Sequence, residues 1–275
     1  MSVTNLAKQR GTILDEIMAF HRENLPKIMR DVPLENVRAF ANIAPPPADF
    51  YAALRQPGVS LIAECKKASP SKGLLVPKYN PVRLARSYVQ GGARAISVLT
   101  DGRHFQGSLE DLRDVRQSVG SQKIPVLRKD FIFHPYQVYE ARAAGADAIL
   151  LITAVLGESD LRDLLKLTHQ LGMNALVEVH TEAELDKALA VSPRIVGVNN
   201  RNLQTFEVDF ANTARLRSLI PAEVAVVAES GIKTASDVRA MRDMNVDAIL
   251  VGESLVKSKD VVTAVKSLIA AGAIK

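Results

Sequence analysis

The stretch Leu61-Ile-Ala-Glu-Cys-Lys-Lys-Ala-Ser-Pro-Ser-Lys-Gly73 begins as an apolar run and becomes charged where that run ends. The apolar half predicts a buried strand. Alternate side chains of a strand share a face, so Glu64 and Lys66 point the same way and Cys65 points toward the other side. Charged groups are almost never fully buried without a partner. The two charges are therefore either a structural ion pair or part of a site.

The same change from apolar to charged residues recurs along the chain. Strand-like runs cover residues 59–66, 94–99, 124–129, 147–152, 174–179, 194–199, 223–228 and 247–251. Helical stretches cover 81–91, 108–118, 135–144, 158–171, 181–190, 209–219, 234–243 and 260–271, and some have capping signals such as Ser108 with Asp111. Buried strands alternating with amphipathic helices indicate a parallel sheet, and eight such units predict a (β/α)8 barrel in the α/β class. An open doubly wound sheet is the alternative. It is disfavoured because no Gly-x-Gly-x-x-Gly turn follows the first strand.

The residues before the first strand predict an N-terminal helical extension. An amphipathic helix is expected over 3–21, where Leu6, Ile13, Leu14, Ile17 and Phe20 recur near helical spacing. A short second helix is expected over 34–41, and the three prolines at 45–47 exclude a regular helix there. We therefore expect residues 1–58 to be an extension packed on the barrel and residues 59–275 to form the barrel itself, as one structural domain.

Composition narrows the classes of function. The 275 residues are 47% hydrophobic and 24% charged, as in a soluble protein with a large core. No apolar run reaches the roughly 18 residues that span a bilayer, and the N-terminus lacks the apolar core of a secretory signal. The single cysteine excludes an internal disulfide, which favours the cytoplasm. The 35 basic and 30 acidic residues are mixed throughout, without a basic tail, so a small anionic substrate is favoured over nucleic acid.

Polar groups follow five of the predicted strands. The functional groups of such barrels come from the carboxyl ends of the strands and the loops beyond them. Reading those ends gives Glu64, Lys66, Lys129, Glu178, Asn199, Arg201, Glu229 and Ser230. The period of two places each charged pair on one face, so these groups can converge at one mouth of the barrel. The sequence therefore predicts an active site there.

The last two strands end in Glu229-Ser-Gly231 and Gly252-Glu-Ser254, each followed by a helix. Backbone N–H groups at such positions commonly bind phosphate in this fold, although either motif alone could be a simple glycine turn. The five histidines show no ligand spacing, and there is no His-Glu-x-x-His or Cys-x-x-Cys motif, so no metal site is expected. His180 is expected to be a solvated loop side chain.

Together these motifs resemble the indole-3-glycerol-phosphate synthase family, in its single-function form. The matching runs are Ile62-Ala-Glu-Cys-Lys-Lys-Ala-Ser-Pro-Ser71, Leu99-Thr-Asp-Gly-Arg-His-Phe-Gln-Gly-Ser108, Leu127-Arg-Lys-Asp-Phe131, Leu176-Val-Glu-Val179, Gly197-Val-Asn-Asn-Arg201, Val227-Ala-Glu-Ser-Gly231 and Val251-Gly-Glu-Ser254. They span about residues 60–257 in the order of the family. The resemblance implies a carboxy-lyase of tryptophan biosynthesis. Enzymes of this family close the pyrrole ring of 1-(2-carboxyphenylamino)-1-deoxyribulose 5-phosphate and release carbon dioxide and water, without a metal or cofactor. The resemblance implies the same reaction here.

The resemblance also implies roles for individual residues. Lys129 would be the acid in ring closure, and Glu178 and Lys66 the candidates for base and acid in dehydration. Glu64 would position or tune Lys66. Lys66, Ser69 and Arg201 would hold the substrate carboxylate, and Asn199 would donate to its hydroxyls or ring substituents. Phe105, Phe131 and Leu150 would hold the anthranilate ring, Glu229 would orient the site, and Ser230 would be a further substrate contact. The backbone N–H groups of Gly231, Gly252, Glu253 and Ser254 would bind the phosphate.

Two other readings stay open from the sequence. Another phosphate-binding barrel, such as a sugar-phosphate isomerase, would need an acid–base pair for an Amadori rearrangement. A non-catalytic phosphosugar-binding protein would lack the lysines, and here both lysines are present. The expected partner is a small phosphorylated substrate, with no nucleic acid or membrane, and the chain is expected to be a monomer or a weak homo-oligomer.

Overall fold

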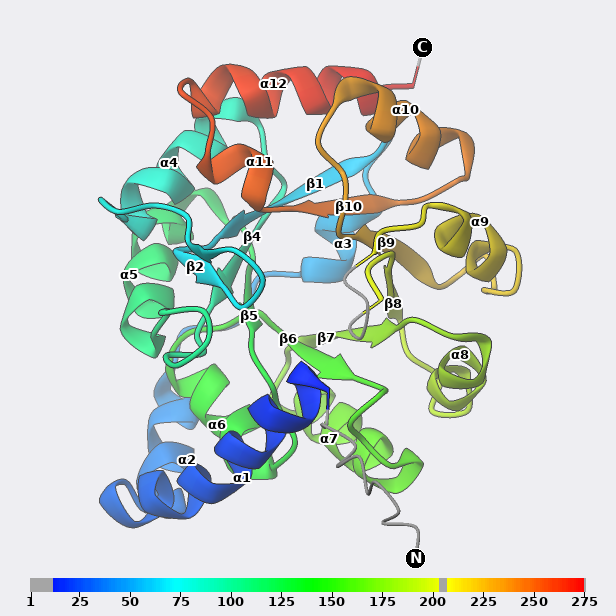
Figure 1. Cartoon of the computed structure of the whole chain (residues 1–275). Helices are drawn as coiled ribbons and strands as arrows, with labels where there is room; N and C mark the ends of the chain where they lie inside the picture. Colours follow the sequence, from blue (N-terminus) through cyan, green and yellow to red (C-terminus); the bar gives the residue numbers. More distant parts are fainter. Residues whose placement is uncertain (1–11, 203–206, 275) are drawn as a thin grey trace, which may run out of the picture.

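The computed structural model describes residues 12–202 and 207–274, which form a closed parallel barrel surrounded by helices (Figure 1). The barrel strands are β1 (Ser60–Cys65), β4 (Ala95–Leu99), β5 (Val126–Lys129), β6 (Ala148–Ile152), β7 (Asn174–Val179), β8 (Ile195–Asn199), β9 (Ala225–Glu229) and β10 (Ala248–Val251). Each pairs with its neighbours in chain order, and β1 closes the barrel by pairing with β10, Ser60 opposite Ala248. This confirms the predicted (β/α)8 barrel, with every strand boundary within two residues.

The helices that alternate with these strands also follow the prediction. They are α4 (Pro81–Gly91), α5 (Leu109–Val119), α6 (Pro135–Ala143), α7 (Glu158–Gln170), α8 (Glu182–Leu189), α9 (Ala211–Arg217), α10 (Ala235–Asp243) and α12 (Val261–Gly272). The cap expected at Ser108 is present, since the Asp111 N–H donates to Ser108 Oγ at 3.0 Å. In the loops of the barrel, four short elements were missed: the hairpin strands β2 (Ala68–Ser69) and β3 (Gly73–Leu74), a 3-10 turn at Gly120–Gln122, and α11 (Glu253–Val256).

The N-terminal helices differ from the prediction. Helix α1 covers Ile13–Asp31 and continues through Pro26, so the predicted end at residue 21 was wrong; residues 3–11 of that prediction lie outside the described residues. The helix continues because Leu25 is buried against Val37 and Tyr136. This burial offsets the free-energy cost of the backbone hydrogen bond that the proline removes. Helix α2 (Leu34–Ile43) confirms the second helix, and α3 (Phe50–Leu54) was not expected.

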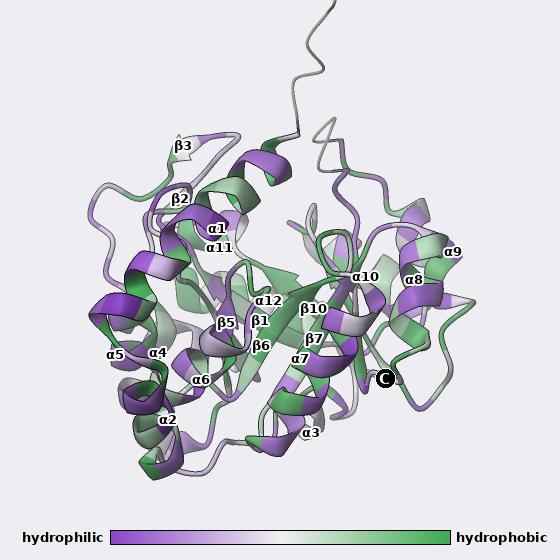
Figure 2. Cartoon of the chain, turned by 90° about the horizontal axis from the view of Figure 1, so that it is seen from below, coloured by the Kyte–Doolittle hydropathy of each residue, from purple (hydrophilic) through white to green (hydrophobic). Residues whose placement is uncertain are grey.

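Helices α1 and α3 contact opposite ends of the barrel (Figure 2), whereas α2 packs against α6. Helix α1 lies at the end where the strands finish, near the β2–β3 hairpin. Helix α3 lies at the other end, where Phe50 and Leu54 are fully buried among side chains of the barrel interior such as Ile62 and Leu127. Tyr51 of α3 donates to the carbonyl of Glu223, just before β9. The extension therefore covers both mouths of the barrel.

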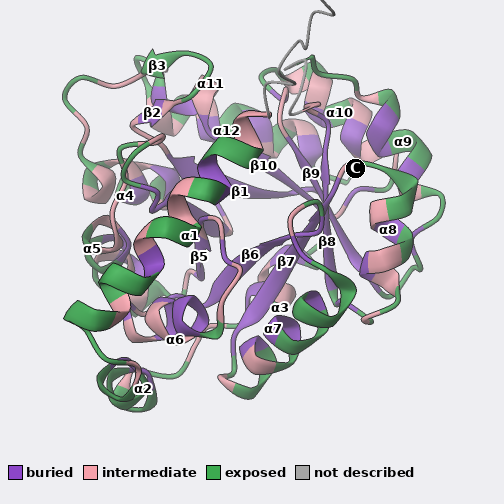
Figure 3. Cartoon of the chain, turned by 60° about the horizontal axis from the view of Figure 1, so that its bottom comes forward, coloured by how far each residue is buried: buried purple, intermediate pink, exposed green. Residues whose placement is uncertain are grey.

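The strands are buried on both faces (Figure 3), which is why they read as continuous apolar runs. On β1, Ile62 and Glu64 point into the barrel, whereas Leu61, Ala63 and Cys65 face the surrounding helices. Cys65 packs with that outer core and is fully buried. Within the described residues, no helix combines the length and apolar character needed to cross a membrane.

Candidate active site

A cavity of about 360 Å³ opens at the carboxyl ends of the barrel strands. Its lining includes every residue that the sequence predicts for the site. These are Glu64, Lys66, Ser69, Phe105, Lys129, Phe131, Leu150, Glu178, Asn199, Arg201, Glu229, Ser230, Gly231, Gly252, Glu253 and Ser254. The chain thus brings groups from all eight strands or the loops after them to one place, as the topology of a parallel barrel requires.

Four charged side chains form one layer inside the top of the barrel. Glu64, Lys129, Glu178 and Glu229 come from β1, β5, β7 and β9, which are alternate strands of the barrel. Inward-pointing residues of alternate strands share a layer in this fold. Two residues earlier on the same strands, the corresponding layer is entirely apolar: Ile62, Leu127, Leu176 and Val227. The sequence therefore places a charged layer directly on an apolar one.

Lys129 lies between two carboxyl groups of this layer. Its Nζ is 3.5 Å from Glu178 Oε2 and 3.3 Å from Glu229 Oε2. Asn199, at the end of β8, donates from Nδ2 to Glu178 Oε1 at 3.2 Å and fixes the second oxygen of that carboxylate. The Lys129 side chain is 16% exposed, so its ammonium is partly buried yet reachable from the cavity.

Lys66 has its own carboxylate partner. Its Nζ is 2.6 Å from Glu64 Oε1, and the Glu64 side chain is only 4% exposed. The prediction that Glu64 and Lys66 point to the same side is confirmed. The layer and Lys66 together hold three carboxyl groups and two amines, so one carboxyl group has no cation of its own.

The pKa values follow from this imbalance. Burial acts to lower the pKa of Lys129, but the charges of Glu229, Glu178 and Glu64 outweigh burial and raise it above its usual value. Burial raises the pKa of Glu229 to about 8, although Lys129 opposes that shift. Lys129 is therefore protonated at neutral pH, and Glu229 is the carboxyl group that retains a proton.

The raised pKa of Glu229 predicts a dependence of stability on pH. An unfolded Glu229 loses its proton near 4.5, whereas the folded one keeps it until about 8. The folded state binds more protons in that window, so the free energy of unfolding falls as pH rises, by about 1.4 kcal/mol for each unit of difference in pKa. We expect Glu229→Gln to remove this fall. Thermal melting at about pH 5 and about pH 8 measures it, with the exposed Glu110→Gln as control; equal slopes for wild type and Glu229→Gln would contradict it.

Gly197 makes room for Glu229. A Cβ at position 197 would lie 2.2 Å from Glu229 Oε1, a buried oxygen that has no hydrogen-bond partner among the described residues. Gly197 is on β8, next to β9, and it pairs with Val227. The absence of a side chain on one strand therefore sets the position of a carboxyl group on the next.

Replacing Gly197 by alanine is expected to move the Glu229 carboxyl group away from Lys129. Overpacking of this kind typically costs about 1–3 kcal/mol of stability, so we expect a lower melting temperature. We also expect kcat to fall roughly tenfold, because the displaced carboxyl group no longer positions the Lys129 ammonium. Gly157→Ala is the matched control, because its added Cβ would lie 3.6 Å from Asp160 Oδ2, an ordinary contact. Unchanged kcat in Gly197→Ala would show that the position of Glu229 does not matter for turnover.

One side of the cavity is an aromatic slot. The rings of Phe105 and Phe131 lie 6.2 Å apart at 37°, and Leu150 is buried beneath the mouth. The wall opposite the strands includes three residues of α1: Ile13, Leu14 and Ile17. Their helical spacing was visible in the sequence, but nothing in it indicated which surface the helix would cover.

The other side of the cavity is rich in backbone N–H groups. Ser230 and Gly231 have left-handed backbone conformations, with φ of 68° and 83°. Such a conformation is uncommon for serine and typical of functional turns. Helix α11 begins next to this turn, and the first N–H groups of a helix have no acceptor within it. Ser254 Oγ is buried there and has no partner among the described residues.

The carboxylate of Glu253 is bound by two lysines. Its Oε1 is 2.7 Å from Lys72 Nζ and 2.8 Å from Lys257 Nζ. Burial would raise the pKa of Glu253, but the hydrogen bonds from Lys257 and Lys72 lower it to about 2. The negative charge at this end of the cavity is thereby neutralised. Lys72 was not among the predicted site residues.

Asn199 is held from several sides. Its Oδ1 accepts the N–H of Arg201 at 3.0 Å. Its carbonyl accepts from Asn212 Nδ2 at 3.1 Å and lies 2.8 Å from His180 Nδ1, which must donate because a carbonyl only accepts. The prediction that His180 is a solvated loop side chain was therefore wrong. The ring fixes the end of β8, a contact between residues that the sequence gave no reason to pair.

Comparison with known proteins gives a consistent result. The family model described as "Indole-3-glycerol phosphate synthase" matches residues 14–268. An indole-3-glycerol phosphate synthase of Mycobacterium ulcerans is 51% identical over 262 residues, which are 95% of each chain. One of Dehalococcoides mccartyi is 48% identical over 258 residues, 94% of this chain and 100% of that protein.

Distant solved structures share the fold. A thiamine phosphate pyrophosphorylase of Pyrococcus furiosus has a TM-score of 0.60 at 18% identity, covering 78% of this chain and 95% of that one. An N-acetylmannosamine-6-phosphate 2-epimerase of Clostridium perfringens has a TM-score of 0.58 at 19% identity, covering 73% and 89%. At such low identity, these two structures show only that the barrel fold is shared. From the family model and the close relatives, the chain belongs to the indole-3-glycerol phosphate synthase family.

Proposed function

We propose that this chain, as an indole-3-glycerol phosphate synthase, closes the pyrrole ring of 1-(2-carboxyphenylamino)-1-deoxyribulose 5-phosphate with its own side chains, without a metal or cofactor. The observation that carries the proposal is the single cavity that joins three features. A protonated lysine sits in a layer of carboxylates, an aromatic slot lies on one side, and a turn rich in N–H groups lies on the other. The substrate has a ketone, an aromatic ring and a phosphate to match them.

Lys129 is proposed as the acid of ring closure. The ring carbon that bears the carboxylate attacks the ketone carbon, and Lys129 protonates the ketone oxygen as the new bond forms. Carbon dioxide then leaves, and the electrons of the broken bond restore the aromatic ring. Because neighbouring carboxylates raise the pKa of Lys129, its proton is present throughout the neutral range. Glu229 positions this ammonium at 3.3 Å.

Glu178 and Lys66 are proposed for the dehydration that follows. Lys66 gives a proton to the departing hydroxyl group, and Glu178 takes one from the adjacent CH2 carbon, which completes the indole. Glu64 orients Lys66 through the 2.6 Å contact, and Asn199 orients Glu178. Each proton lost by one group is gained by another, so the step needs no external reactant.

The remaining lining residues are proposed to bind the substrate. Lys66, Ser69 and Arg201 hold its carboxylate, Asn199 donates to its hydroxyls, and Phe105, Phe131 and Leu150 hold its ring. Ser230 and the N–H groups of Gly231, Gly252, Glu253 and Ser254 take the phosphate. Ser254 Oγ supports this assignment, because a buried hydroxyl normally has a hydrogen-bond partner and this one has none in the part of the chain that the structure describes.

Metal removal tests the proposed chemistry. We expect the purified chain to form indole-3-glycerol phosphate, followed by its fluorescence, at the same rate before and after dialysis against EDTA. All acid, base and charge-binding roles are assigned to side chains, so no rate should be lost. A loss that Mg²⁺ or Zn²⁺ restores would contradict the cofactor-free mechanism, and no turnover by folded chain would contradict the reaction itself.

The wider setting of the enzyme is also a proposal. We infer that residues 1–58 are an extension of a single barrel domain rather than a second domain, since α3 shares the core of the barrel interior. A monomer or weak homo-oligomer in the cytoplasm, acting on a small phosphorylated substrate and not on nucleic acid or membranes, fits the mixed surface charge and the single buried cysteine.

A further inference from the structure

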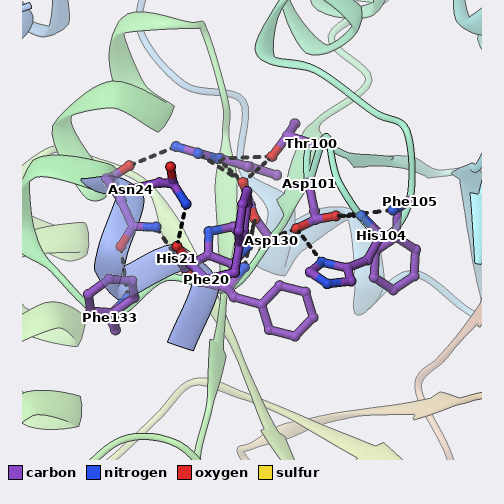
Figure 4. A network of polar contacts seen from close by, with 12 residues as sticks. Phe20, His21, Asn24, Thr100, Asp101, His104, Phe105, Asp130 and Phe133 are labelled. Atoms are coloured by element: carbon purple, nitrogen blue, oxygen red, sulfur yellow. Dashed lines mark hydrogen bonds and ion pairs between the residues drawn. The ribbon is translucent and has the colours of Figure 1, made fainter. Parts of the chain in front are cut away.

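A buried network of imidazoles and carboxylates joins α1 to the mouth of the barrel (Figure 4). His21 Nε2, from α1, lies 2.8 Å from Asp101 Oδ2 and 4.0 Å from Asp130 Oδ1. The Asp101 side chain is fully buried, and that of Asp130 is 4% exposed. His104 Nδ1 reaches the same oxygen of Asp101 at 3.3 Å. The steps proposed above use none of these four side chains.

The network is built from hydrogen bonds rather than arranged for a metal. Burial would raise the pKa of Asp101, but hydrogen bonds from His21, His104 and Phe105 lower it to about 2, so this group is ionised. An ionised carboxylate only accepts, and His21 Nε2 must therefore carry the hydrogen and donate. Asp130 Oδ2 already accepts from Arg128 Nη2 at 2.9 Å and from Thr100 Oγ1 at 2.5 Å.

The two carboxylates that face His21 also hold the aromatic slot. Asp101 Oδ1 accepts the N–H of Phe105 at 3.0 Å, and Asp130 Oδ1 accepts the N–H of Phe131 at 2.8 Å. The His21 ring itself lies 5.5 Å from the Phe131 ring. A single side chain of α1 is thus in contact with the anchors of both aromatic residues of the slot.

The face of α1 that carries His21 is the face that closes the cavity. Ile17, Leu14 and Ile13 precede His21 by four, seven and eight positions, which places all four on one side of the helix. All three apolar residues line the cavity. The middle of α1 is thereby connected to the aromatic slot through His21, while the first turns of α1 form a wall of the substrate site.

We propose that His21 is a positioning residue for the aromatic ring of the substrate. It holds α1 and the two slot phenylalanines in one arrangement, so that Ile17 and its neighbours close on the ring. It acts on substrate binding, not on the chemical steps. The inference rests on the proposed function only for the identity of the ligand that enters the slot.

Kinetics, binding and hydrogen exchange of the full chain test this role together. We expect His21→Ala to raise KM about tenfold with kcat changed less than threefold, and to weaken binding of the ketone-reduced substrate, which cannot cyclise, to a similar extent in calorimetry. Amide exchange should accelerate in residues 13–31. His21→Gln should restore most of each effect, because its amide can donate from nearly the position of Nε2. Arg22→Ala, exposed on the same helix, is the matched control.

Three results would overturn the proposal. They are unchanged binding and exchange in His21→Ala, a loss confined to kcat, or a His21→Gln variant as impaired as His21→Ala. If His21→Ala fails to fold, Asp101→Asn replaces it, since its Oδ1 still accepts from Phe105 while the charge facing His21 is gone. Calorimetry and exchange do not need turnover, so an inactive wild type would contradict the reaction and leave this test intact.

Discussion

Lys129→Ala is expected to lower kcat by about 10³-fold, within the range usually lost when a positioned acid is removed. Among residues 12–202 and 207–274, Lys129 is the only cation within 4.0 Å of both Glu178 and Glu229. Its removal takes away the proton donor for the ketone oxygen and leaves the Glu178 carboxylate without its nearest cation. Initial rates of indole-3-glycerol phosphate formation, measured by fluorescence at saturating substrate, give the effect.

Lys129→Arg separates the charge of this residue from its proton. A guanidinium keeps a cation beside Glu178 and Glu229, but it does not release a proton in proteins. We therefore expect it to preserve the melting temperature better than alanine while kcat stays nearly as low. Lys266→Ala, an exposed lysine on α12, serves as the control. A Lys129→Ala variant with more than about a tenth of wild-type kcat would transfer the acid role to Lys66.

Glu178→Gln is expected to lower kcat by about 10²-fold, because an amide of the same shape cannot accept the proton released in dehydration. KM should change little, since the substitution keeps the contact between Asn199 and Oε1. The defect should appear after ring closure, so the cyclised, decarboxylated intermediate should accumulate in quenched single-turnover samples. The exposed Glu158→Gln on α7 is the control. Wild-type release of carbon dioxide together with wild-type indole formation would exclude Glu178 as the base.

Much of the barrel could be predicted from the sequence because each strand is buried on both faces. Residues 148–152 are apolar throughout, and the polar residues Asp147 and Thr153 that bound the run are visible without tertiary information. The convergence of Glu64, Lys129, Glu178 and Glu229 also followed from the sequence. Parallel strands place their carboxyl ends at the same mouth, and a period of two decides which side chains point inward.

The parts that were missed depend on contacts between distant residues. Helix α1 extends past residue 21 because Leu25 is buried against α2 and α6, and the apolar spacing over residues 3–21 does not reveal that contact. His21 lies 80 positions from its partner Asp101, and no spacing rule links them. His180 is similar, since its acceptor is the backbone of another strand. The charge balance that keeps a proton on Glu229 depends on three carboxyl groups and two lysines together. They come from four strands and the loop after β1, so no single strand reveals it.

The pairing of β1 with β10 has a consequence for how the protein is made. The first strand leaves the ribosome early, whereas its partner at residues 248–251 is synthesised near the end of the chain. Until then the barrel has two open edges, and unpaired strand edges invite pairing with other chains. Contacts of such long sequence separation also slow folding. Helix α3 is synthesised immediately before β1 and packs on the inward-facing apolar side chains of the strands. It can therefore cover these side chains before β10 is synthesised.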